Sequence, residues 1–155
     1  MACKKSDKEG IRAKIFELWP RLLEVIDTKS REGKKLASKL CDWSVFMDEI
    51  NEGNKHLIIA VAPFAEEEYN SHDLLESIAR ISAKQPFEAY EVWIRLLEGT
   101  SQDFPEEAIR SALTNLVRVG SEGQRNAKDV VSKYLRGGNE RPSQWLREIN
   151  AGAAP

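Results

Sequence analysis

The sequence predicts an all-α fold in which antiparallel helical hairpins stack as a short solenoid. Apolar residues recur at i, i+3, i+4 and i+7 along most of the 155 residues, whereas the strict alternation typical of strands is almost absent. The motif W-x-R-L-L-E also occurs twice, at Trp19–Glu24 and at Trp93–Glu98. The separation of 74 residues is twice a period of 37, which lies in the range of stacked helix-pair repeats. An irregular helical bundle is the alternative.

Four amphipathic helices are expected in the first half of the chain. Three should cover residues 11–26, 30–50 and 54–62, and a fourth carries Leu74, Leu75, Ile78 and Ile81 and ends before Pro86. Pro20 lies inside the first helix, where it should bend or break the axis because proline has no amide hydrogen to donate. The helix at 54–62 is apolar nearly all round and is therefore expected near the centre.

The first two helices each carry a broad apolar face that should belong to the core. On the first helix this face consists of Ile15, Leu18, Trp19, Leu22, Leu23 and Ile26. On the second it consists of Leu36, Leu40, Trp43, Met47 and Ile50.

Four more helices are expected in the second half. The fifth covers residues 86–98 and stops at Gly99. The sixth and seventh should begin at capping boxes, in which a side chain at the helix start accepts an unpaired amide hydrogen. Those boxes are Asp103 with Glu106, and Ser121 with Gln124. The eighth covers residues 143–150, after the Gly137-Gly138 hinge. Residues 1–10 are expected to be a flexible segment and 151–155 a disordered tail, which leaves one domain at 11–150.

The repeat extends beyond the tryptophan motif. At an offset of 73, three apolar residues of the sixth helix fall opposite three of the second, pairing Ile109, Leu113 and Leu116 with Leu36, Leu40 and Trp43. A second helix in nearly the same phase favours duplication over chance. This layout resembles the HEAT and armadillo-like class of antiparallel helical repeats over residues 11–136.

No pattern in the sequence indicates an enzyme, a metal site or a cofactor. The phosphate-binding motifs G-x-x-x-x-G-K-[ST] and G-x-G-x-x-G are absent. The only histidines are His56 and His72. Cys41 with His56 is the sole thiol pairing, and Cys41 is more simply a small core residue. Glu68 and His72 have the i, i+4 spacing of metal ligands, but a turn at 70–71 separates them, which favours a solvated surface.

Segments for membrane insertion or secretion are not apparent. The longest apolar run, Leu57–Ala62, ends at Pro63 and is far too short to span a bilayer. The charged start lacks the apolar stretch of a secretory signal. Cys3 and Cys41 have no disulfide-framework spacing, which is typical of cytosolic proteins with free thiols. We therefore expect a cytoplasmic location.

Charge is distributed unevenly along the chain, although the total is only −2. Residues 1–40 carry a net +5, residues 41–108 a net −11, and residues 109–155 a net +4. In a stacked array sequence order becomes spatial order, so the middle should be electronegative between two positive ends.

The function expected from these features is a non-catalytic scaffold or sensor module that mediates protein–protein interaction within a larger assembly. Glu66, Glu67, Glu68 and Glu76 are the candidate residues for a basic protein or peptide. Trp145, beyond the glycine hinge, either packs on the last hairpin or projects towards a partner.

Nucleic-acid binding is the alternative function. It would use Arg118, Arg125, Lys128, Lys133 and Arg136 near the end of the stack. Against it stands a pI of about 5.8. The identity of the partner and the oligomeric state are left open.

Overall fold

The computed structural model describes residues 5–66, 70–99 and 105–153, and these residues form helices and no strand. The all-α prediction is confirmed. The α-helices are α1 (Lys5–Val25), α2 (Arg31–Leu40), α3 (Lys55–Val61), α4 (Asn70–Ser82), α5 (Pro86–Leu97), α6 (Glu106–Val117), α7 (Ser121–Arg136) and α8 (Arg141–Ala153). Two 3-10 helices, η1 (Cys41–Phe46) and η2 (Ala62–Phe64), follow α2 and α3 directly.

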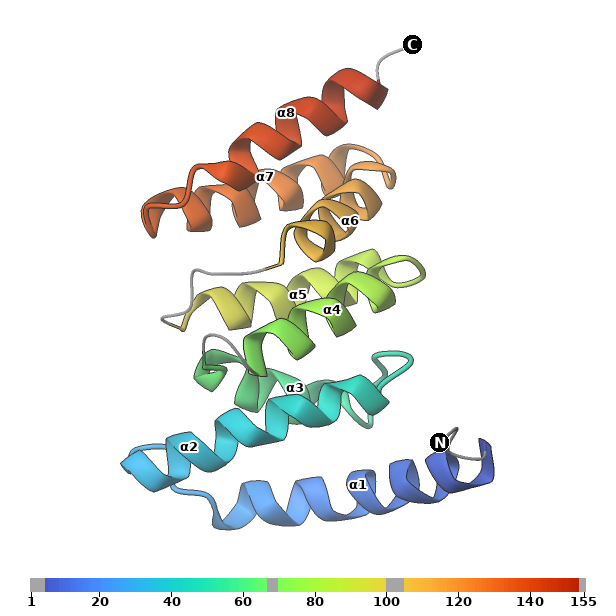
Figure 1. The fold of residues 1–155 in the computed structure, drawn as a ribbon, viewed down its shortest axis with the longest axis vertical. Helices are drawn as coiled ribbons and strands as arrows, with labels where there is room; N and C mark the ends of the chain where they lie inside the picture. The colour runs from blue at the N-terminus through green and yellow to red at the C-terminus, as the bar shows by residue number, and fades with distance from the viewer. Residues whose placement is uncertain (1–4, 67–69, 100–104, 154–155) are drawn as a thin grey trace.

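The helices follow one another in chain order along the long axis of the molecule, from α1 at one end to α8 at the other (Figure 1). Their contacts define two layers. In one layer α4 packs between η1 and α6, and α6 packs between α4 and α8. In the other, α1 packs on α3, and α5 packs between α3 with η2 and α7. The layers meet where α4 packs on α5, and α7 packs on α6 and α8.

The two tryptophans of the repeated motif lie in the same layer, on α1 and α5, and both are fully buried. Their surroundings differ. The Trp93 Nε1 donates to the Tyr134 hydroxyl at 3.1 Å. Trp19 stacks on Phe16 and meets Trp43 edge-on, with ring centroids 5.9 Å apart in the second pair. Its buried Nε1 has no hydrogen-bond partner among the described residues. The two copies of the motif therefore share the burial of their tryptophan but not its polar contacts.

The expected helix at 30–50 is shorter than predicted, because the α-helix ends at Leu40 and a 3-10 helix continues from it. Most of the predicted apolar face is kept despite the change of helix type, since Leu40, Met47 and Ile50 are buried and Trp43 is half-buried. Leu36 is 50% exposed, whereas Ile109, its counterpart on α6, is 1% exposed. The expectation that Leu36 belongs to the core is wrong.

The predicted flexible ends are also shorter than expected. The helix α1 begins at Lys5 rather than at residue 11, and α8 continues to Ala153. Residues 5–10 and 151–153 thus continue the helical backbone of the domain. Pro20 lies inside α1 without interrupting it.

Of the two predicted capping boxes, only the one at the start of α7 lies wholly in the described part of the chain, and it does not form as expected. Asp103 of the other box lies outside the described residues, and Glu106 follows Pro105 as the first residue of α6. Ser121 is the first residue of α7, and the N-cap is Gly120, whose φ of 92° suits glycine.

Polar side chains connect helices within each layer. The Tyr90 hydroxyl of α5 donates to the Asp129 carboxylate of α7 at 2.7 Å. Burial, followed by this hydrogen bond and the charge of Asp129, raises the pKa of Tyr90 to about 12. In the other layer the Asn115 amide of α6 donates to the Ser82 hydroxyl of α4 at 2.9 Å. Such contacts satisfy polar groups that packing takes out of water.

A close approach between α6 and α7 requires glycine at position 123. A Cβ placed there would lie 1.9 Å from the Leu116 carbonyl oxygen. We expect Gly123→Ala to lower the free energy of unfolding by about 1–3 kcal/mol, because the backbone must shift to admit the methyl group. Thermal denaturation measures the loss. Gly10→Ala, at a helical position with nothing within 4 Å, is the matched control and should not destabilise the protein. Equal melting temperatures for both variants would contradict the close approach.

Cys41 should be chemically inert in the folded protein. It is fully buried, and its Sγ donates to the Val61 carbonyl oxygen at 3.3 Å. Burial, and secondarily the charge of Asp42, raises the pKa of the Cys41 thiol well above its usual value. In a Cys3→Ser variant we expect no reaction with a thiol reagent such as DTNB under native conditions and complete reaction in denaturant. Rapid reaction of the native protein would contradict this burial.

Candidate functional site

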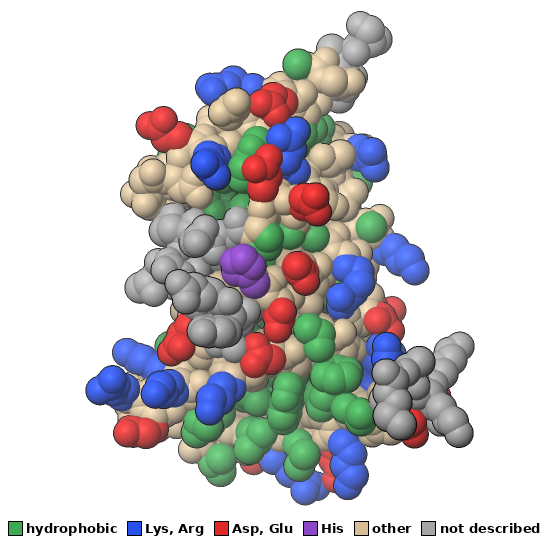
Figure 2. All heavy atoms as spheres, viewed as in Figure 1, with side chains coloured by type: hydrophobic (Ala, Val, Ile, Leu, Met, Phe, Trp, Pro, Cys, Tyr) green, Lys and Arg blue, Asp and Glu red, His purple; other side chains and the backbone are tan. Residues whose placement is uncertain are grey.

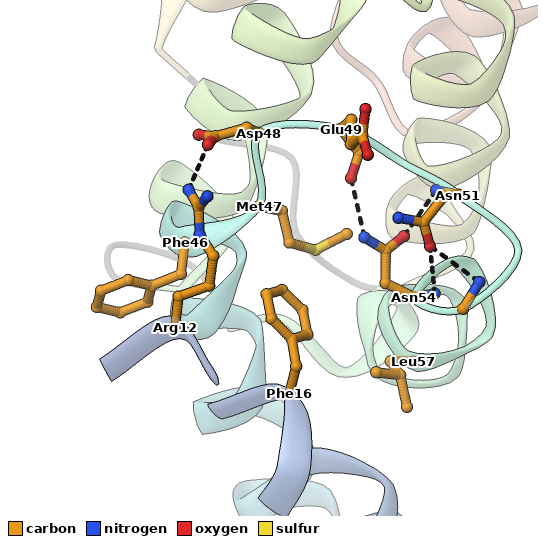
Figure 3. Close-up of a pocket in the computed structure, with 10 residues that line it drawn as sticks. Arg12, Phe16, Phe46, Met47, Asp48, Glu49, Asn51, Asn54 and Leu57 are labelled. Atoms are coloured by element: carbon orange, nitrogen blue, oxygen red, sulfur yellow. Dashed lines mark hydrogen bonds and ion pairs between the residues drawn. The ribbon is translucent and has the colours of Figure 1, made fainter. Parts of the chain in front are cut away.

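A cavity of about 560 Å³ lies between the first half of α1, η1 and the loop that leads into α3 (Figure 3). It is lined by Arg12, Phe16, Phe46, Met47, Asp48, Glu49, Asn51, Gly53, Asn54 and Leu57. Phe16, Met47 and Leu57 surround the open space, and the guanidinium of Arg12 reaches across to the Asp48 carboxylate with which it forms an ion pair. The described lining thus combines apolar side chains with one ion pair at the edge.

Two asparagines fix the loop that forms one wall of this cavity. The Asn54 Nδ2 donates to the Glu49 carbonyl oxygen at 2.9 Å, and its Oδ1 accepts from the Asn51 backbone amide at 2.9 Å. The Asn51 Oδ1 accepts from the Gly53 amide at 2.9 Å. Asparagine side chains form such turns readily because they reproduce backbone hydrogen bonds.

The same loop is tied to the middle of the stack. The Gln85 Oε1 accepts from the Ile50 amide at 2.7 Å, and its Nε2 donates to the Ile50 carbonyl oxygen at 2.8 Å. The Arg80 Nη2 donates to the Met47 carbonyl oxygen at 2.6 Å. The loop wall is thus held by side chains of α4 and of the turn that precedes α5.

Exposed apolar side chains gather at the same end of the molecule. Among the described residues, six of the eight exposed large hydrophobic side chains lie between positions 11 and 45. We call these six the N-terminal apolar surface: Ile11, Leu18, Leu22, Val25, Leu36 and Val45. Figure 2 shows the hydrophobic side chains concentrated over the end where α1 and α2 lie.

This surface corrects the sequence-based expectation that Leu18 and Leu22 belong to the core. Among the α1 side chains whose exposure is described, only Ile15 and Trp19 are buried. The sequence already indicated that part of this face would stay uncovered. Placed around a helix at 100° per residue, the apolar residues of α1 form an arc of roughly 180°, with Val25 at one edge and Phe16 at the other. One neighbouring layer cannot cover so wide an arc.

Only two of the four predicted acidic residues, Glu66 and Glu76, lie in the described part of the chain. Glu66 is exposed after η2, and Glu67 and Glu68 lie outside the described residues. Glu76, on α4, lines a hollow of about 440 Å³ with Glu106 and Glu107 at the start of α6. Sequence reasoning singled out Glu76 but neither of these two. Both stand in the first turn of α6, where the positive end of the helix dipole favours a carboxylate.

Trp145 is not available to a partner in this structure, which corrects its selection as a partner-binding residue. Its side chain is 6% exposed and packs in the hydrophobic core. The indole is the largest apolar side chain type, so burying it stabilises the packing of α8 on the preceding helices.

The predicted basic residues do not form an unbroken stripe. Arg125, Lys128 and Arg136 are exposed on α7, and Lys133 is half-buried. Arg118 belongs to another element, as the C-cap of α6. Asp129 falls between the basic positions on α7 and adds an opposite charge.

The described residues contain no cluster of three or more His, Cys, Asp or Glu side chains that could hold a metal ion. No helix in the described part of the chain has the length and apolar character needed to cross a bilayer. Comparison with protein-family models, curated proteins and solved structures finds no match.

The loop wall depends on Asn54, which is buried. We expect Asn54→Ala to lower the free energy of unfolding by about 1–3 kcal/mol, because the Asn51 amide and the Glu49 carbonyl lose their partner. Denaturant titration measures this loss. Glu52→Ala, an exposed change in the same loop, should leave stability nearly unaltered. If both variants unfold at the same denaturant concentration, Asn54 does not hold the loop.

Proposed function

We propose that this chain is a non-catalytic protein-interaction module whose N-terminal end, formed by α1, α2 and η1, binds a partner protein. The observation that carries the proposal is the concentration of exposed apolar side chains on the N-terminal apolar surface. Contiguous exposed apolar area costs free energy in water and is typical of interaction sites.

The two ends of the stack differ in a way that supports this proposal. The last helix of a stack normally presents a polar outer face to water. The helix α8 does so, because it buries Trp145 and Leu146 and exposes Gln144, Arg147 and Glu148. The helix α1 instead exposes Leu18 and its apolar neighbours. A partner that covers α1 would complete the stack.

The cavity beside α1 adds a feature that flat apolar patches lack. Interfaces commonly place one large side chain in a pocket near their centre. The apolar walls made by Phe16, Met47 and Leu57 could receive such an anchor, while Arg12 and Asp48 at its edge could bind polar groups.

A HEAT- or armadillo-like repeat architecture, a scaffold or sensor role within a larger assembly and a cytoplasmic location are part of the same proposal. The two-layer packing and the matching burial of Trp19 and Trp93 support the architecture. The free, buried thiol of Cys41 suits a reducing compartment.

Two other surfaces are supported less well. The hollow with Glu76, Glu106 and Glu107 suits a basic peptide, but the Arg110 guanidinium already lies 3.3 Å from Glu106. Nucleic-acid binding would require the basic residues of α7, among which Asp129 intervenes. Retardation of DNA or RNA with steep salt dependence would favour that alternative.

Affinity capture from native host cells tests the proposal. The variant Leu18→Gln with Leu22→Gln replaces two exposed side chains, so the fold should persist while captured partners fall at least about tenfold. Val119→Gln with Leu135→Gln makes the same chemical change at comparably exposed positions elsewhere and is the matched control. Quantitative mass spectrometry compares the three proteins. If both double variants retain the same partners as the original chain, the N-terminal end is not the binding site.

A further inference from the structure

The apolar residues of α1 have the spacing of a helix that packs against another helix. Ile11, Ile15, Leu18, Leu22 and Val25 are separated by four, three, four and three residues. This is the alternation of the a and d positions in a coiled-coil heptad, with Ile15 and Leu22 at a and the other three at d. We call these five residues the α1 seam.

The seam is open along most of its length. Ile11, Leu18, Leu22 and Val25 are 44%, 42%, 37% and 78% exposed, whereas Ile15 is buried. A hollow of about 480 Å³ runs beside the first part of the seam, between α1 and the Trp43 ring of η1. The seam is thus both an apolar row and one wall of a depression, which is the shape that a helix requires.

One flank of the seam carries basic side chains. Lys14 and Arg21 each precede an a position, so they occupy successive g positions beside the seam, and both are exposed. Asp7 occupies the preceding g position at the N-terminal end of the hollow. The other flank includes Trp19, which is buried in the body of the protein. Arg12, on that same flank, is paired with Asp48. Arg21 lies 3.9 Å from Glu17, but an exposed pair of this kind contributes little and can be exchanged for a carboxylate of a partner. Partner selection by charge therefore falls to Lys14 and Arg21.

We propose that the α1 seam binds an amphipathic α-helix of another protein that carries acidic residues opposite Lys14 and Arg21. This inference rests on the interaction module proposed above and specifies its partner. The apolar stripe of the partner helix covers Leu18 and Leu22, and its carboxylates pair with the ammonium of Lys14 and the guanidinium of Arg21.

A second copy of this chain fits the seam less well. Two seams in antiparallel, fully overlapping contact would be symmetric about Leu18. Lys14 of one copy would then be level with position 22 of the other, one residue from Arg21, so the two basic side chains would lie side by side along the same flank. Like charges in such flanking positions oppose pairing.

Two synthetic peptides test the proposal on the full chain. Both contain three heptads with Leu at a and d, and they carry either Glu or Lys at every e and g position. Repulsion between identical flanks disfavours self-association of either peptide. In fluorescence anisotropy at low ionic strength, the Glu peptide should bind at least about tenfold more tightly than the Lys peptide.

Matched variants assign the binding to the seam. Lys14→Glu with Arg21→Glu should reverse the preference between the peptides, whereas Arg125→Glu with Lys128→Glu, which alters net charge equally on α7, should preserve it. Leu18→Gln with Leu22→Gln should weaken binding of the Glu peptide at least about tenfold, and Val119→Gln with Leu135→Gln should not. The substituted side chains of all four double variants are exposed, so circular dichroism should show an unchanged helical fold.

Several outcomes would overturn the proposal. These are failure of both peptides to bind, equal binding of both, or indifference to the seam variants. Concentration-dependent dimers of the chain that Leu18→Gln with Leu22→Gln abolishes, without peptide binding, would assign the seam to a second copy. Binding to vesicles that contain phosphatidylserine, without binding of the Glu peptide, would assign it to a membrane surface. If host partners still depend on Leu18 and Leu22 while the peptide preference fails, the interaction module stands and only the acidic-helix partner is wrong.

Discussion

Contact between alternate helices within each layer is the constraint on which the rest of the structure depends. A helix such as α4 or α5 can bury its apolar side chains because it has a neighbour on each side in its own layer and another helix across from it. A terminal helix lacks one of these neighbours. At the C-terminal end, the face of α8 that has no neighbouring helix carries polar residues. At the N-terminal end, the corresponding face of α1 exposes leucines to water. The location of the exposed apolar surface follows directly from this difference.

Polar contacts position the layers without competing with the apolar core. Tyr90 with Asp129 and Asn115 with Ser82 each join helices that are next neighbours in one layer. Gln85 does the same for a loop, because its side-chain amide satisfies both backbone groups of Ile50 as a neighbouring strand would. These hydrogen bonds lie away from the ends of the stack and connect the helices in its middle. The helix α1 is held mainly by apolar packing.

The helical period was sufficient to predict the all-α class and the burial of Trp19 and Trp93, because a regular apolar face identifies a helix from local sequence alone. The width of the apolar arc on α1 indicated that part of it would stay uncovered, but the period alone could not predict that Leu18 and Leu22 are the side chains that face water, because this depends on where the neighbouring helices lie. The change to a 3-10 helix at Cys41 and the exposure of Leu36 within α2 likewise have no local signature. The carboxylates of Glu76 and Glu107 share a hollow only through the packing of α4 on α6, a contact between residues 31 positions apart in the sequence.

The unpartnered indole nitrogen of Trp19 has a consequence for how the molecule opens. A buried donor without an acceptor costs about 1–3 kcal/mol, and Ile15 is the one other side chain of α1 that is described as buried. The first helix is therefore the segment whose amide protons should exchange with solvent at the lowest free energy, ahead of α4 to α7. Since the seam proposed to bind a partner lies on that same helix, a bound partner would suppress this local opening, and the first helix would then unfold together with the rest of the domain.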